Sequence, residues 1–126
     1  MDKTRVRAII IKNGKYLLVK SNEEHNCGQW QFVGGNVESE DLLNEIKREV
    51  REELGTDLTN AKYAFPVQGR RGKVHYFTGS LKGKIKIDRN EIADYGYFDC
   101  KSAEKLSLSN TARLTFKRLC QKSHNH

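Results

Sequence analysis

The sequence of 126 residues lacks any long run of apolar side chains. Its longest strictly apolar runs, at 8–11 and 16–19, have four residues each, whereas a helix that spans a bilayer needs about 20. The first residues interleave charged with apolar side chains and show neither the apolar segment nor the small-residue cleavage site of a signal peptide. We therefore expect no membrane partner and a cytoplasmic location.

Cysteine is scarce and shows no paired spacing. Cys27, Cys100 and Cys120 are odd in number, and none belongs to a Cys-x-x-Cys pair. Without a secretion signal, this spacing disfavours both a disulfide framework and a zinc site. We expect three reduced thiols.

Repeats, linkers and low-complexity segments are also missing. The composition is 37% hydrophobic and 31% charged. Because the apolar residues fall in short clusters, a disordered or collagen-like chain is excluded. A chain of this length suits one compact domain over residues 1–126.

Charge, by contrast, is abundant and unevenly placed. Lys and Arg exceed Asp and Glu by 23 to 16, which gives a net charge of +7. Residues 38–57 carry a net charge of −5, and residues 61–90 carry +7. The basic block is either an ordinary solvated face or a surface that guides a polyanion toward carboxylates holding divalent cations.

Hydrophobic periodicity predicts an α+β fold in which helices flank a mixed sheet. The dipeptide Asn13-Gly14 favours a hairpin turn between the first two strands, and the glycine pair Gly34-Gly35 is expected to form a loop after the third. The expected strands are 6–11, 16–19, 29–33, 61–67, 74–81 and 95–99.

Two helices are expected. The first, over 41–54, follows a capping side chain at Ser39 and stops at Gly55, where a left-handed cap suits glycine. The second begins at Ser109 or Asn110 and places apolar residues on one face.

The first helix gathers acidic side chains on one stripe beside its apolar face. At roughly 100° per residue, this stripe holds Glu45, Glu49, Glu52 and Glu53. Like charges three or four residues apart repel, so the arrangement costs stability unless a cation offsets it. Oxygen ligands at this density suit Mg²⁺ or Mn²⁺ together with substrate phosphates. The alternative is a solvated acidic face.

The residues around this helix resemble the signature of the Nudix hydrolase family. Its positions are matched by Gly34, Glu40, Arg48, Glu49, Val50, Glu52, Glu53 and Gly55, with five residues between Gly34 and Glu40 and seven between Glu40 and Arg48. The segment 30–35 is similar to the family's Trp-x-x-Pro-Gly-Gly, with Val33 in place of proline. Thr56 replaces the final aliphatic residue, and the stretch between the glycine pair and Arg48 is one residue shorter than is usual.

The resemblance implies a Nudix-like α/β/α sandwich and a magnesium-dependent hydrolase, with Mn²⁺ as a possible substitute. It implies a metal site made by Glu49, Glu52, Glu53 and the carbonyl of Gly34, with Glu91, or else Asp94, as a further ligand. Arg48 would hold a neighbouring carboxylate, and Glu49 or Glu53 would be the general base. Such metals bridge phosphate oxygens and activate the attacking water. For Glu91 the alternative is an exposed acid before a strand.

Several side chains outside the signature are candidates for binding the substrate. The rings of Trp30, Phe32 and Tyr76 either stack on a base or belong to the core. A glycine-bounded turn places Arg70, Arg71 and Lys73 together, which suits a triphosphate or an RNA 5′ end. His75 is interpreted as a strand residue rather than a base.

We expect a MutT-like enzyme that cleaves a nucleoside triphosphate to the monophosphate and pyrophosphate, acting as a monomer or homodimer. The alternatives are a hydrolase of dinucleoside polyphosphates or of RNA 5′ pyrophosphates, and a nucleotide-binding module without catalysis. ADP-ribose is disfavoured because Pro66, the one proline, does not lie where that subgroup has its marker.

Overall fold

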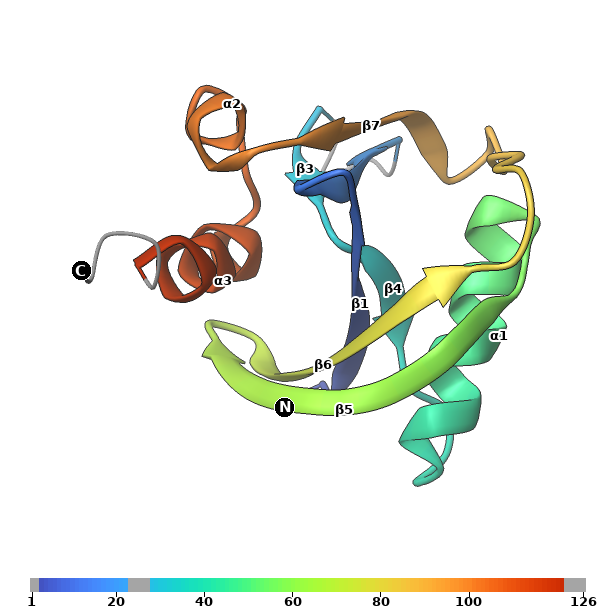
Figure 1. Cartoon of the computed structure of the whole chain (residues 1–126). Helices are drawn as coiled ribbons and strands as arrows, with labels where there is room; N and C mark the ends of the chain where they lie inside the picture. Colours follow the sequence, from blue (N-terminus) through green and yellow to red (C-terminus); the bar gives the residue numbers. More distant parts are fainter. Residues whose placement is uncertain (1–2, 23–27, 122–126) are drawn as a thin grey trace.

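A computed structural model describes residues 3–22 and 28–121. In chain order, its elements are β1 (Arg5–Lys12), β2 (Lys15–Ser21), β3 (Trp30–Gln31), β4 (Val33–Asn36), α1 (Leu42–Leu54), β5 (Leu58–Gly69), β6 (Gly72–Leu81), β7 (Ile92–Phe98), α2 (Cys100–Glu104) and α3 (Asn110–Gln121). Figure 1 shows α1 on one side of the strands and α2 and α3 on the other. The predicted mixed sheet flanked by helices is confirmed.

Strand β1 organises the sheet because it has partners along its whole length. Its first half pairs antiparallel with β4 and parallel with β6, and its last residues pair antiparallel with β2. The strand order is β3-β2-β1-β6-β5, with β4 attached to β1 and β7 to β2. Side chains alternate along β1, so Val6, Ala8 and Ile10 enter one core cluster while Ile9 enters the other.

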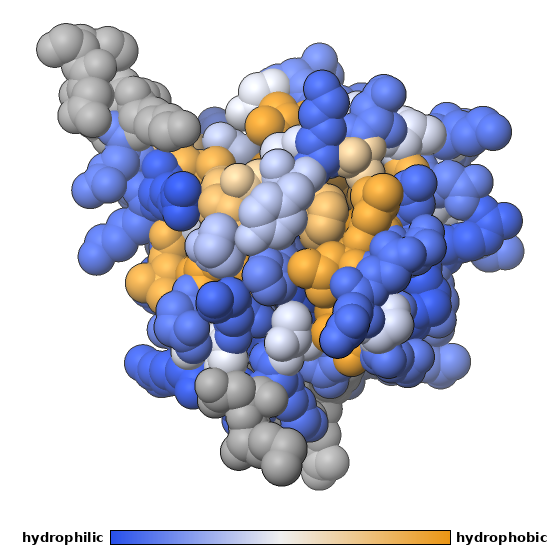
Figure 2. Space-filling view, turned by 90° about the horizontal axis from the view of Figure 1, so that it is seen from below, coloured by the Kyte–Doolittle hydropathy of each residue, from blue (hydrophilic) through white to orange (hydrophobic). Residues whose placement is uncertain are grey.

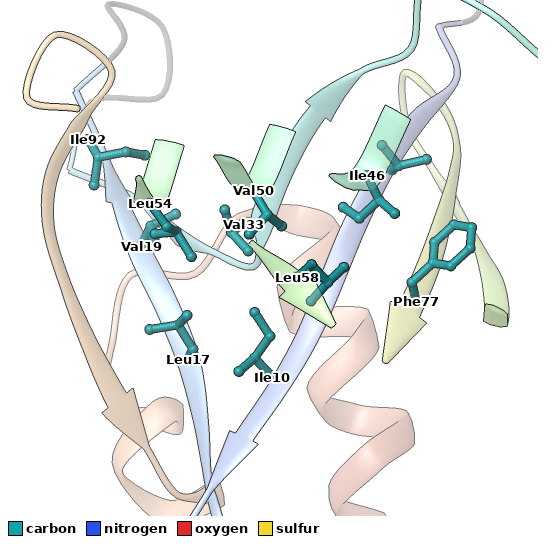
Figure 3. Packing of buried hydrophobic residues seen from close by; sticks show 12 residues of the cluster. Ile10, Leu17, Val19, Val33, Ile46, Val50, Leu54, Leu58, Phe77 and Ile92 are labelled. Carbon is teal, nitrogen blue, oxygen red and sulfur yellow. The ribbon is translucent and has the colours of Figure 1, made fainter. Parts of the chain in front are cut away.

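The first core cluster anchors α1. Figure 3 shows Ile46, Val50 and Leu54 of α1 pointing toward apolar side chains of the neighbouring strands. All three are completely buried, and burial of such a side chain stabilises the fold by about 1.5–3 kcal/mol. This packing fixes the rotation of α1 and therefore the direction of its acidic stripe.

The second core cluster lies beneath α2 and α3. It includes Phe32, Tyr76 and Phe116, whose rings pack with centroids 5.1 Å (Phe32 to Phe116) and 5.6 Å (Phe32 to Tyr76) apart. On the lower side of the molecule, where β5 runs along the sheet edge, apolar side chains gather in patches broken by hydrophilic ones (Figures 1 and 2). Tyr63 of β5 is 49% exposed.

The turn and cap predictions are confirmed in part. Asn13 and Gly14 have positive φ angles of 53° and 75°, as a tight hairpin turn requires, and Gly55 ends α1 with φ of 66°. The cap at the start of α1 is Asp41 and not Ser39, because the Asp41 carboxylate accepts a hydrogen bond from Asn44 N at 3.2 Å.

The predicted glycine loop is wrong. Gly34 and Gly35 lie within β4, paired with Arg7 and Val6 of β1. A Cβ on Gly34 would overlap the Val6 carbonyl. Glycine is therefore required here by the close approach of two strands, which local turn signals do not reveal.

The prediction of reduced thiols is also wrong for two of the cysteines. Cys100 of α2 and Cys120 of α3 form a disulfide across 20 residues, with their Cα atoms 6.1 Å apart. The short helix α2 was not predicted, and its position beside α3 brings these distant cysteines within bonding reach. Cys27 lies outside the described residues. Among the helices that are described, none is long and apolar enough to cross a membrane.

Candidate active site

Helix α1 buries part of its acidic stripe. Glu49 is 9% exposed and Glu53 is 7% exposed, although both are carboxylates. They lie one helical turn apart beside the core residues that fix the helix, so packing holds both against β4. Glu52, on the same helix, is exposed instead.

Glu49 and Glu53 line a cavity of about 270 Å³, which we call the carboxylate pocket. Glu91, from the turn before β7, lines the same pocket, so the structure brings this sequence candidate to the helix carboxylates. The glycine pair of β4 forms another wall, where Gly34 N donates to Glu53 Oε1 at 3.4 Å. Two elements that are far apart in sequence thus converge on one cluster of oxygen atoms.

The environment of these carboxylates disfavours their negative charge. Burial raises the pKa of Glu53 well above its usual range, and repulsion from Glu49 and Glu91 adds to this rise, while Arg7 opposes it. Burial also raises the pKa of Glu49, against the influence of Arg48. A bound divalent cation would stabilise the ionised forms of both groups.

Arg48 holds several carboxylates of the stripe, as the resemblance implied for it. Its guanidinium lies 3.0 Å from Glu45, 3.1 Å from Glu49 and 3.1 Å from Glu52. A hydrogen bond to Glu45, then one to Glu52 and the negative charge of Glu49, raise the pKa of Arg48. The pKa of Glu45 is lowered by a hydrogen bond from the Glu38 backbone and then by Arg48. Arg48 contacts Oε2 of Glu49, while Oε1 is the atom nearest to Gly35.

The oxygen atoms that border the pocket are chemically suited to a hard divalent cation. Glu49, Glu53, Glu91 and the peptide of Gly34 supply carboxylate and carbonyl oxygens, the ligands that Mg²⁺ takes in proteins. Within residues 3–22 and 28–121, no three Asp, Glu, His or Cys side chains are already arranged as a metal site. A carboxyl must be deprotonated to ligate a cation, and burial opposes the ionised form of both Glu49 and Glu53.

Three residues that the resemblance offers as metal ligands have other contacts. Glu52 is not among the described residues that line the carboxylate pocket, and its carboxylate lies beside Arg48. The Gly34 carbonyl accepts a hydrogen bond from Arg7 Nη1 at 3.3 Å. Asp94, the alternative to Glu91, is exposed and accepts from Tyr95 N at 2.8 Å.

Arg5 and Arg7 of β1 line the carboxylate pocket, and the sequence reasoning missed both. Arg7 is only 6% exposed, and its Nη1 donates to Phe32 O at 2.9 Å. The signal that could have found them is the alternation of Arg5 and Arg7 with apolar residues in a predicted strand.

The basic block of residues 61–90 is divided in the structure. Arg71, in the turn between β5 and β6, lines the carboxylate pocket, and Arg70 lies beside it along the neighbouring cavity. Lys73 is exposed and is not among the described residues lining either cavity. Lys84 lines a separate cavity at the other end of β1, with Ile11 and Tyr95.

The candidate aromatic residues lie in the core rather than along these cavities. Phe32 is 0% exposed and Tyr76 is 1% exposed. Of the two alternatives left open by the sequence, stacking on a base or belonging to the core, both rings therefore belong to the core. Trp30 is half-buried and packs on Phe98, with ring centroids 5.1 Å apart. His75 is a strand residue, and its Nδ1 lies 2.8 Å from the Tyr63 hydroxyl.

Comparison with known proteins supplies the family. The NUDIX domain model matches residues 1–119. The chain belongs to the Nudix family. The carboxylate pocket therefore coincides with the signature helix and glycine pair of a Nudix hydrolase, and the resemblance seen in the sequence is confirmed.

Some relatives of this Nudix hydrolase have names that describe them as nucleotide hydrolases or RNA hydrolases. A protein of Escherichia coli O139:H28 named nucleoside triphosphatase NudI is 42% identical, covering 82% of this chain and 72% of its own length. The NAD-capped RNA hydrolase NudC of Vibrio atlanticus is 28% identical over 75% of this chain, which spans only 36% of that protein. The crystal structure of a MutT Nudix hydrolase from Burkholderia pseudomallei shares the fold, with a TM-score of 0.77, 22% identity and coverage of 93% and 97% of the two chains.

Proposed function

We propose that this protein is a magnesium-dependent pyrophosphohydrolase that cleaves a nucleoside triphosphate to the monophosphate and pyrophosphate. The observation that carries the proposal is the carboxylate pocket, in which Glu49, Glu53 and Glu91 face Arg5 and Arg7. Carboxylates and guanidinium groups in one small cavity suit a substrate that brings both phosphate oxygens and a divalent cation.

The carboxylates of the pocket, and Arg48 beside them, have separate roles in this reaction. Glu49, Glu53 and Glu91 would hold the Mg²⁺, which, when bound, neutralises charge on the phosphate oxygens and activates the attacking water. Arg48 fixes the position of Glu49 through its 3.1 Å contact. Glu49 or Glu53 takes the proton of the attacking water, because both carboxylates line the pocket in which that water would be held.

The positive side of the pocket recognises the substrate. Arg7 and Arg71, with Arg5 between the two cavities, attract a polyphosphate and counter the charge that accumulates on the leaving phosphate. The identity of 42% to a protein named nucleoside triphosphatase supports a nucleoside triphosphate as the substrate.

A second candidate is a hydrolase of dinucleoside polyphosphates or RNA 5′ pyrophosphates. The observation that favours it is the basic turn, because Arg70 and Arg71 line a cavity that continues beyond the carboxylate pocket. A binding module without catalysis is disfavoured, since Glu49 and Glu53 bear a desolvation cost that a pure binder does not require.

The test is a substrate panel followed by ³¹P NMR. The panel contains the nucleoside triphosphates, diadenosine tetraphosphate, ADP-ribose and 5′-triphosphorylated RNA, each with Mg²⁺ and with EDTA. The proposal expects pyrophosphate from a nucleoside triphosphate with Mg²⁺ and none with EDTA. Turnover of RNA alone would establish the second candidate instead, and tight nucleotide binding without any turnover would leave a binding module.

Glu53→Gln is the matched variant because it keeps the size of the side chain and removes the charge. Replacing a general base or metal ligand should lower turnover by about a hundredfold or more. Lys84→Ala, in the separate cavity at the other end of β1, is the control that should retain turnover.

A further inference from the structure

A second cavity, of about 390 Å³, adjoins the carboxylate pocket. Three residues, Arg5, Gln31 and Arg71, line both cavities, so the two form one continuous cleft. We call the second cavity the arginine pocket, because four arginines line it: Arg5, Arg70, Arg71 and Arg113. None of the described residues lining it is acidic.

The arginines come from three separate elements. Arg5 belongs to β1, Arg70 and Arg71 to the turn between β5 and β6, and Arg113 to the first turns of α3. The fold therefore brings like charges together across the cleft. Such crowding destabilises the protein unless an anion offsets it.

Two arginines that line the cleft, Arg5 in both cavities and Arg7 in the carboxylate pocket, each have one nitrogen without a hydrogen-bond partner. The Nε atoms of Arg5 and Arg7 are buried and have no hydrogen-bond partner among the described residues. Burial and repulsion from Arg7 lower the pKa of Arg5, and Arg71 adds to this effect. A buried guanidinium donor without a partner is costly, and the charge of an anion bound nearby would offset part of that cost.

Neutral hydrogen-bonding groups line the rest of the arginine pocket. Gln29 and Gln31 come from the β3 side, and Ser109, Asn110 and Thr111 come from the start of α3. Amides and hydroxyls can donate to the same oxygen atoms that arginine binds, without adding negative charge. The pocket is thus built from donors around a concentration of positive charge.

We infer that the arginine pocket binds a phosphate group of the substrate that lies outside the diphosphate held at the carboxylate pocket, and that it does so without a divalent metal. The inference rests on the proposed function only in assigning both pockets to one substrate. The phosphate is supplied either by the polyphosphate of a nucleotide or by the backbone of an RNA 5′ end. Guanidinium groups bind both through paired N–H donors.

The test is calorimetric titration of the protein with tripolyphosphate in EDTA at low salt. Wild type should bind, and Arg113→Ala and Arg71→Ala should each weaken binding by about tenfold. Both arginines are exposed, so these variants should fold, and a thermal melt checks that they do. Lys84→Ala removes a positive charge from the separate cavity and is the matched control, expected to bind like wild type.

Glu53→Gln separates this inference from the proposed function. The variant should bind tripolyphosphate in EDTA at least as tightly as wild type, because a negative charge is removed near the cleft, while its turnover with Mg²⁺ is lost. If the wild type binds in EDTA but hydrolyses no nucleotide, the pocket stands and the proposed function fails.

A second titration uses a short single-stranded RNA with a 5′ monophosphate. Binding of either probe that weakens in Arg113→Ala and Arg71→Ala supports the pocket, and the probe that binds more tightly identifies the source of the phosphate. The inference is overturned if neither probe binds in EDTA, or if both arginine variants bind like the Lys84→Ala control.

Discussion

The side chain of Glu49 lies directly against the backbone of Gly35. A Cβ added to Gly35 would fall 2.5 Å from Glu49 Oε1. The glycine therefore leaves the space in which a carboxylate of α1 reaches the carboxylate pocket. Gly34 is required for a different reason, because its added Cβ would overlap the Val6 carbonyl of the neighbouring strand.

This difference predicts different outcomes for two alanine variants. Gly35→Ala should keep the fold, because the far end of a glutamate side chain can move, but it should lower kcat/KM by about tenfold or more by displacing Glu49. Gly34→Ala should unfold or strongly destabilise the protein. Thermal melts and steady-state kinetics of both variants check this. Full activity of Gly35→Ala would show that the position of Glu49 is unimportant.

Arg48 is predicted to act through the carboxylates that it contacts. Arg48→Ala removes the guanidinium that contacts Glu45, Glu49 and Glu52. The variant should weaken Mn²⁺ binding by about 10–100-fold, because loss of a residue that orients metal ligands has an effect of this size. Arg51→Ala is the matched control, since Arg51 is exposed and pairs with Asp57 at the end of the same helix. Equal Mn²⁺ affinities of the two variants would refute this role.

Much of α1 could be predicted because its signals are local. The spacing of Ile46, Val50 and Leu54 and the glycine at position 55 define the helix within one residue of its observed bounds. The Asn13-Gly14 turn is equally local. Glu91 could be associated with the helix only through the family resemblance, because tertiary structure brings it there.

The rest depends on how distant elements meet. Packing between segments far apart in the chain sets three features. These are the pairing of the glycine strand β4 with β1, the direction of Arg5 and Arg7, and the bonding partner of Cys100. The aromatic residues illustrate the same limit. Phe32 and Tyr76 each follow a polar residue in a strand, but both rings are buried in the core cluster that includes Phe116 of α3.

The carboxylate pocket predicts how stability depends on pH in the absence of metal. Burial raises the pKa of Glu53, and also that of Glu49, above the ordinary value of 4.5. As the pH rises above 4.5, the unfolded chain releases these protons before the folded protein does, so the free energy of unfolding should fall. Urea unfolding in EDTA, at several values between about pH 5 and 8, measures this fall in the free energy of unfolding.

The double variant Glu49→Gln/Glu53→Gln is the comparison for this pH dependence. Its glutamines cannot titrate, so its unfolding free energy should fall less than that of wild type over the same pH range. Parallel profiles for the two proteins would mean that these carboxyls do not titrate abnormally in the folded state.

The disulfide between α2 and α3 should stabilise the α3 side of the fold. It closes a loop across 20 residues, for which chain entropy gives about 3 kcal/mol. Cys100→Ser should therefore lower the melting temperature of the oxidised protein and leave that of the reduced protein almost unchanged. Equal melting temperatures of oxidised wild type and Cys100→Ser would contradict this contribution.

We expect Glu49, Glu53 and Glu91 together to hold a divalent cation. Electron paramagnetic resonance with Mn²⁺ tests it directly, through the fraction of Mn²⁺ that remains free as protein is added. Wild type should bind Mn²⁺, Glu53→Gln should bind it far more weakly, and Glu104→Gln, which alters an exposed residue of α2, should bind like wild type. Equal Mn²⁺ binding by wild type and Glu53→Gln would contradict the claim.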